Sequence, residues 1–88
     1  MKASDWKAAV RALVYPVQFS MDPEKDVDRA LAALLGRSGT VWTREGLAES
    51  VRAALTSRAH LAGLIPQKHS EEVLRRYLAA ALRRLMNP

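Results

Sequence analysis

The stretch from Ser70 to Leu85, SEEVLRRYLAAALRRL, constrains the fold most strongly, because from Leu74 onward its leucines and arginines fall on opposite sides at the helical period. At about 100° per residue, one half of the helix carries Leu74, Tyr77, Leu78, Ala81, Leu82 and Leu85. The other half carries Arg75, Arg76, Ala79, Ala80, Arg83 and Arg84. An apolar stripe this wide predicts a helix that buries one side in a helical core, with Ser70 as its N-cap.

The first forty residues predict two further helices. One should begin after Ser4 and end near residues 14–15, because the residue before Pro16 avoids the helical region. Its predicted core positions are Trp6, Ala9, Val10 and Leu13. The segment 17–21 then alternates apolar and polar residues, and its short length between two helices predicts a packed connector rather than a strand.

The second helix should begin at Asp22, with its side chain as the cap and Pro23 at the first helical position. Gly36 should end this helix in the left-handed conformation. The predicted core positions are Val27, Ala30, Leu31 and Leu34, with Leu35 on the flank.

Thr43 is the predicted cap of a third helix, whose apolar positions are Leu47, Ala48, Val51, Ala54 and Leu55. Thr56 and Ser57 either interrupt this helix or cap a short additional one before Pro66. The one strand candidate, residues 40–42, is too short to form a sheet alone. We therefore predict a single all-α domain over residues 1–88, folded as a compact bundle of four to five short helices.

The composition is that of a globular protein, with 49% hydrophobic and 26% charged residues and no cysteine. The N-terminal segment has a charge every few residues and therefore predicts neither a signal peptide nor a membrane span. We expect a cytoplasmic location and no membrane partner.

The residues that usually carry catalysis are sparse. His60 and His69 are separated by a proline and have no carboxylate at a metal-site spacing. The loop GRSGT at residues 36–40 lacks the spacing of a phosphate-binding loop, and the acidic residues 22–28 lack the glycine and glutamate of a calcium loop. We expect no catalytic residue, no metal or cofactor and no small-molecule substrate, so the chain is predicted not to be an enzyme.

The net charge of +5 lies entirely in the second half, because residues 1–36 carry five basic and five acidic groups. Such an asymmetry favours an acidic partner, although arginine-rich composition alone also places arginines on a surface. Within the last helix, Arg75 and Arg76 follow Glu71 and Glu72 by four residues, the favourable order for ion pairs. Arg83 and Arg84 follow alanines, and only the helix dipole is expected to balance their charge.

Trp42 precedes the Thr43 cap, where tryptophan either packs on the helix start against Leu47 or stands exposed as a partner anchor. The candidate partner-binding residues are Arg83, Arg84, Arg76, Arg75, Lys68, Arg58, Arg52 and Trp42.

Two functions are weighed for these residues. The first is a non-catalytic protein–protein interaction module of the adaptor, inhibitor or immunity type, which presents a basic surface to an acidic protein or self-associates. The alternative is a nucleic-acid-binding protein whose basic second half contacts phosphates. A helix-turn-helix is disfavoured because Arg52 stands four residues after Ala48, where the motif has glycine. Base stacking is disfavoured because Trp6, Tyr15 and Tyr77 are expected in the core.

Overall fold

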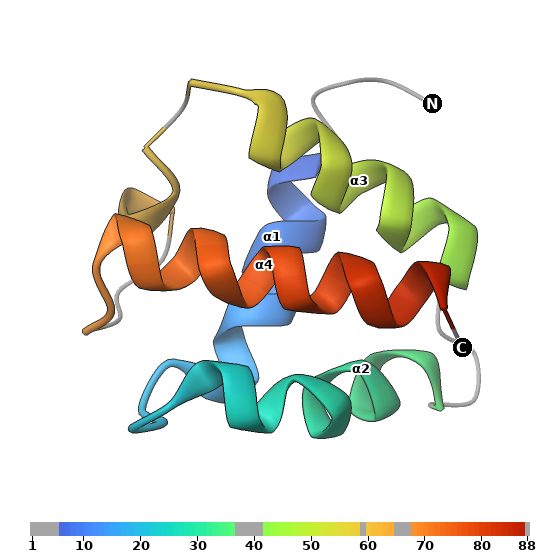
Figure 1. Ribbon diagram of the computed structural model, residues 1–88, viewed down its shortest axis with the longest axis horizontal. Helices are drawn as coiled ribbons and strands as arrows, with labels where there is room; N and C mark the ends of the chain where they lie inside the picture. The colour runs from blue at the N-terminus through green and yellow to red at the C-terminus, as the bar shows by residue number, and fades with distance from the viewer. Residues whose placement is uncertain (1–5, 37–41, 59, 65–67, 88) are drawn as a thin grey trace.

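The computed structural model describes residues 6–36, 42–58, 60–64 and 68–87, and within these ranges it contains helices and no strand. The α-helices are α1 (Trp6–Val14), α2 (Val27–Leu35), α3 (Arg44–Thr56) and α4 (Glu71–Met86). Short 3₁₀ turns occur at η2 (Tyr15–Val17), η3 (Pro23–Asp26) and η4 (Leu61–Gly63). The predicted all-α fold is therefore confirmed (Figure 1).

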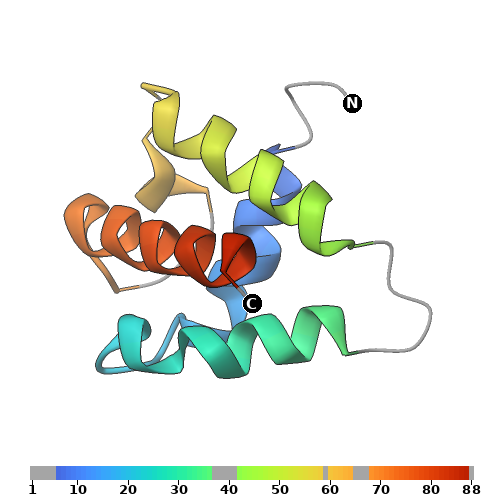
Figure 2. The same cartoon turned by 45° about the vertical axis from the view of Figure 1, so that its right-hand side comes forward.

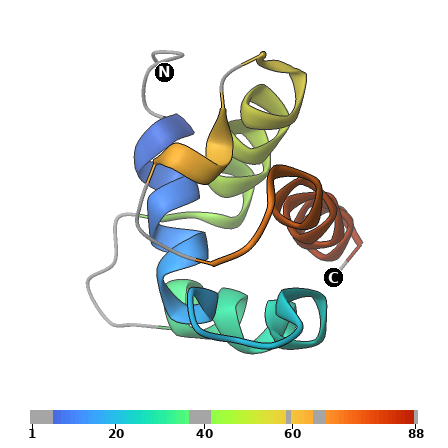
Figure 3. The ribbon, with the colours of Figure 1, turned by 90° about the vertical axis from the view of Figure 1, so that its left-hand side faces the viewer.

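Helix α4 is the central element of the bundle. It runs between α3 and α2, which lie on opposite sides of it, and α1 crosses behind (Figures 1 and 2). Seen from the end, α1 and α4 stand on opposite sides of the molecule (Figure 3). The Tyr77 hydroxyl on α4 donates a hydrogen bond of 2.6 Å to the Leu13 carbonyl oxygen on α1, so the two helices are joined through the core.

The core is built from the predicted stripes of all four helices. Its buried members include Val10, Leu13, Val27, Leu31, Leu47, Val51, Leu74, Tyr77, Leu78 and Leu85. Ala80, which the helical period placed on the arginine side of α4, is also buried. It is buried because α2 and α3 flank α4 on two sides.

Two of the predicted helix starts are confirmed at the level of their hydrogen bonds. The Thr43 hydroxyl accepts from the Gly46 N–H at 3.0 Å, and the Ser70 hydroxyl accepts from the Val73 N–H at 3.3 Å. Helix α1 ends at Val14, immediately before the turn that contains Pro16, as the proline predicts. Ser4 lies outside the described residues.

Other helix ends differ from the predictions. The Asp22 side chain makes no capping hydrogen bond, and the segment after it begins as the 3₁₀ turn η3. Gly36 adopts φ −85° and not the left-handed conformation. A Cβ at Gly36 would stand 2.7 Å from the Ala32 carbonyl oxygen, so glycine suits this helix end by close approach and not by a positive φ. Helix α3 ends at Thr56, and in the described residues 57–58 and 60–64 the turn η4 is the helical element that follows it.

Among the described residues, every helix is too short or too polar to cross a lipid bilayer. The Cα radius of gyration is 11.7 Å, close to the roughly 12 Å expected of a folded chain of this length.

Candidate partner-binding surfaces

Arg75 is half-buried, and its guanidinium contacts groups of the chain itself. Its guanidinium donates to the Leu55 and Ser57 carbonyl oxygens at 3.1 and 3.2 Å, and to Glu71 Oε2 at 2.9 Å. Leu55 and Ser57 lie at the C-terminal end of α3, where carbonyl groups lack helical partners. Arg75 therefore satisfies the end of α3 from the neighbouring helix, and its predicted ion pair with Glu71 is confirmed.

Glu71 completes this connection on the other side. Its Oε1 accepts from the Ala62 N–H at 2.8 Å, which joins α4 to the turn η4. Burial by itself would raise the pKa of Glu71, but the Ala62 and Leu61 N–H groups and Arg75 together outweigh it and hold the pKa below its usual value. His60 Nε2 lies 3.8 Å from the same carboxylate. Glu71 and Arg75 thus hold α3, η4 and α4 together.

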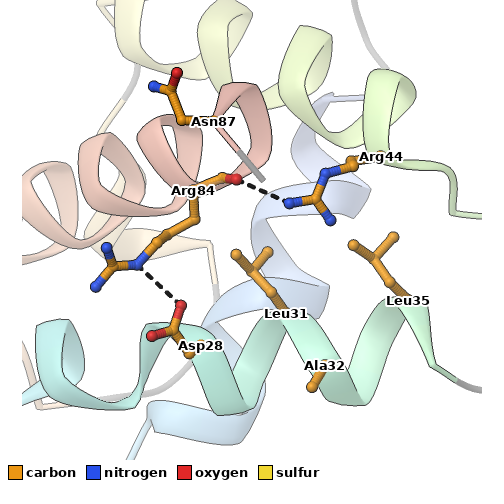
Figure 4. A pocket seen from close by; sticks show the side chains of 7 residues that line it. All are labelled: Asp28, Leu31, Ala32, Leu35, Arg44, Arg84 and Asn87. Atoms are coloured by element: carbon orange, nitrogen blue, oxygen red, sulfur yellow. Dashed lines mark hydrogen bonds and ion pairs between the residues drawn. The ribbon is translucent and has the colours of Figure 1, made fainter.

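Arg76 and Arg84 contact the region of α2 and η3. Arg76 Nε lies 3.9 Å from Glu24 Oε1, a partner distant in sequence. The ion pair with Glu72 that the helical spacing predicted does not form among the described residues. Arg84 Nε donates to Asp28 Oδ1 at 2.9 Å (Figure 4). The expectation that only the helix dipole balances Arg84 was therefore wrong, because the fold brings α2 alongside α4.

A small open groove of about 310 Å³ lies beside the Arg84–Asp28 pair. Leu31 and Leu35 of α2 point toward Arg44 of α3 across it (Figure 4). Arg44 Nη2 donates to the Arg84 carbonyl oxygen at 2.8 Å, so a guanidinium also satisfies the C-terminal end of α4. The apolar floor could hold a small apolar side chain, while the Asp28 carboxylate at its rim weakens its attraction for anions.

The remaining basic candidates do not converge on one face. Lys68 precedes α4 and Arg83 lies in its last turn, so at about 1.5 Å per residue they stand roughly 20 Å apart along the helix. Arg58 follows the end of α3, which the Arg75 hydrogen bonds place at the same end of the molecule as the start of α4. Arg52 donates to Met86 Sδ at 3.2 Å, at the other end. Lys68, Arg58 and Arg83 are exposed.

Trp42 is half-buried and packs against the hydrophobic core. This position fits packing on the start of α3 better than a fully exposed anchor. The predicted set of eight residues is thus divided between internal contacts and two separated ends of the bundle.

Among the described residues, the large apolar side chains that are most exposed lie elsewhere, on the connector between α1 and η3, with Met86 at the end of α4 less exposed. Tyr15 is 68% exposed, Phe19 79% and Met21 93%. The expectations that Tyr15 faces the core and that the segment 17–21 is packed were therefore wrong, except for Val17, which is buried. We call Tyr15, Phe19 and Met21 the connector surface.

The backbone that carries the connector surface is held by specific hydrogen bonds. His69 Nε2 lies 2.9 Å from the Val17 carbonyl oxygen, so this nitrogen carries the proton that it donates. The Ser20 N–H donates to the same oxygen at 3.0 Å, and the Ser20 hydroxyl donates to the Asp26 carboxylate. Phe19 therefore lies in the chain between Val17 and Ser20, and both of these residues are held by hydrogen bonds to other parts of the fold.

Charges of opposite sign flank the connector surface. Lys7 and Arg11 are exposed at four-residue steps before Tyr15, so the three share the outer side of α1 and the turn that continues it. Lys7 Nζ lies 5.9 Å from the Trp6 ring, and no carboxylate of the described residues pairs with either cation. On the other flank, Asp22 is exposed next to Met21.

The sequence carried a weak signal for this surface. Val17, Phe19 and Met21 alternate with polar residues. One buried apolar side chain is enough to hold so short a connector on the core, and this one has three. The signal does not say which of them is buried, because that depends on which elements pack over the connector.

Comparison with known proteins adds no relative. No protein-family model matches the chain, and neither the curated proteins nor the solved structures yield a significant match.

Proposed function

We propose that this chain is a small helical module that binds another protein through the connector surface. The observation that carries the proposal is the exposure of Tyr15, Phe19 and Met21 within one seven-residue stretch of fixed backbone. An aromatic side chain has roughly 150–250 Å² of surface. With Met21, the two aromatic side chains expose apolar area on the order of several hundred Å², the size of exposed apolar patches that are often functional on monomers.

The same class of function was expected with the basic second half as the contact surface. We place the contact on the connector instead, because Arg75, Arg76 and Arg84 bind groups of the chain itself. Arg83, Lys68 and Arg58 are exposed but stand at separated ends of the bundle, so they do not form one contact surface.

Nucleic acid is the less favoured partner. Tyr15 and Phe19 could stack on bases, and Lys7 and Arg11 could contact phosphates. However, Asp22 borders the connector surface, and Asp26 is hydrogen-bonded to Ser20, which lies between Phe19 and Met21 in the chain. These carboxylates repel a phosphate backbone, whereas an apolar centre with a rim of both signs is usual for a protein interface.

Site-specific photo-crosslinking tests the proposal. A photoreactive phenylalanine analogue at position 19, in cells that produce the protein, should crosslink to a defined protein. The same analogue at Glu49, an exposed position on α3, should not give that product. Replacing Tyr15 and Met21 with serine should remove the crosslink without unfolding the chain, since both side chains are mostly exposed. Equal crosslinking from positions 19 and 49 would refute the proposal.

A further inference from the structure

The unequal charges around the connector surface indicate what kind of partner surface it fits. We infer that the partner is an acidic protein segment that places carboxylates over Lys7 and Arg11 and apolar side chains against Phe19 and Tyr15. The inference rests on the proposed function and adds the chemistry of the partner to it.

The geometry of α1 supplies the first step. Lys7, Arg11 and Tyr15 succeed one another by four residues, so at about 1.5 Å per residue they form a strip roughly 12 Å long. The opposite side of α1, with Ala9, Val10 and Leu13, is buried in the core. The strip is thus an outer face, continuous in sequence with the exposed Phe19 and Met21.

The state of the two cations supplies the second step. Some arginines of the fold are paired with carboxylates, as in Arg29 with Asp26, Arg75 with Glu71 and Arg84 with Asp28. Among the described residues, the exposed Arg58 and Arg83 are not, but they stand away from the connector surface. Lys7 and Arg11 have no such partner among the described residues. An acidic segment would complement them, which raises association rate and fixes orientation more than it raises affinity.

A second copy of the chain fits this surface less well. A two-fold contact through the connector surface would bring the Lys7–Arg11 strips of two copies with a net charge of +5 each into proximity. A single strand of nucleic acid would meet Lys7 and Arg11 but also Asp22 and Asp26. An acidic, partly apolar protein segment matches the cationic strip and the apolar side chains together.

Three matched peptides test the inference with the intact chain. Each is an amphipathic helix with the same leucine and phenylalanine face, flanked by glutamate in one, glutamine in the second and lysine in the third. We expect the glutamate peptide to bind tightest by fluorescence anisotropy, with an affinity that falls as salt is added. Amide shifts in NMR spectra should map its contact to α1 and residues 15–22.

Substitutions test the contribution of the two cations separately from that of the apolar side chains. Lys7→Glu with Arg11→Glu should weaken the glutamate peptide about tenfold, or about 1.4 kcal/mol, and remove most of the salt dependence. The control Arg58→Glu with Arg83→Glu makes the same change in net charge at other exposed positions and should alter the affinity less than about twofold. Phe19→Ser should weaken all three peptides.

Each remaining outcome has a defined meaning. If the three peptides bind the connector surface equally, or if the glutamate peptide does not bind, the inference is overturned, while crosslinking from position 19 still decides the proposed function. A thymidine oligonucleotide that shifts Tyr15 and Phe19 and outcompetes the glutamate peptide would assign the surface to nucleic acid. A dimer in sedimentation that Phe19→Ser abolishes would assign it to a second copy.

Discussion

At the scale of single residues, two arginines of one helix have different roles because different groups lie within hydrogen-bonding distance of each. Arg75 and Arg83 lie on the same helix, eight residues apart, and the helical period placed both on the charged side. Arg75 reaches two carbonyl groups at the end of α3 and the Glu71 carboxylate. Arg83 is exposed and pairs with no carboxylate of the described residues.

This difference predicts unequal costs of truncation. Arg75→Ala should lower the free energy of unfolding by about 1–3 kcal/mol, because it leaves the Leu55 and Ser57 carbonyl groups and the Glu71 carboxylate with fewer partners. Arg83→Ala should change it by less than about 0.5 kcal/mol. Urea denaturation with an unchanged m-value measures both. Similar costs for the two variants would contradict the role assigned to Arg75.

At the scale of elements, a capping side chain works only when the backbone before the helix directs it to the first turn. Thr43 and Ser70 have ψ values of 160° and 166°, and each accepts a hydrogen bond from an N–H of its helix. Asp22 has ψ 92° and makes no such bond. The dipeptide Asp22-Pro23 does mark the start of this helical segment. The segment begins with the 3₁₀ turn η3, and the Asp22 side chain does not cap it.

The caps can therefore be ranked by substitution. Thr43→Ala should destabilise the chain by about 1 kcal/mol, within the range measured for N-caps. Asp22→Ala should cost clearly less, because no capping hydrogen bond is lost. Thermal unfolding followed by circular dichroism compares the two. A loss for Asp22→Ala as large as that for Thr43→Ala would show that Asp22 caps the segment in solution.

At the scale of the whole molecule, stability depends on contacts between segments that are far apart in the chain. The Tyr77 hydroxyl reaches Leu13, and burial together with the nearby Asp26 charge raises the pKa of Tyr77. Glu71 reaches η4 directly and α3 through Arg75. Side chains of α4 therefore connect it to α1, α3 and the turn η4.

Glu71 makes part of this stability depend on pH. Its folded pKa lies below the unfolded value of 4.5, so its contribution is present above that pH and is lost as the pH falls through the lower folded value. At pH 7, Glu71→Gln should be less stable by an amount on the order of 1 kcal/mol. The difference from the wild type should shrink on acidification toward pH 3, because the wild-type carboxyl then becomes neutral as well. Denaturation at both pH values measures it, and a constant difference would contradict this role.

Much of the fold could be predicted from the sequence. The apolar periods of Trp6–Leu13, Val27–Leu34, Leu47–Leu55 and Leu74–Leu85 determined the helices and most of the core, because helical periodicity is a local property of the chain. The Thr43 and Ser70 caps are local in the same sense.

The surface was decided only by tertiary structure. Arg84 meets Asp28 across 56 residues of sequence, so no helical spacing could reveal the pair. Phe19 and Met21 have the same apolar character as buried Val17, and they are exposed because the elements packed around the connector cover one side of it and not the other. Exposure depends on which surfaces the remaining chain occludes, and occlusion arises from the packing of all the helices together.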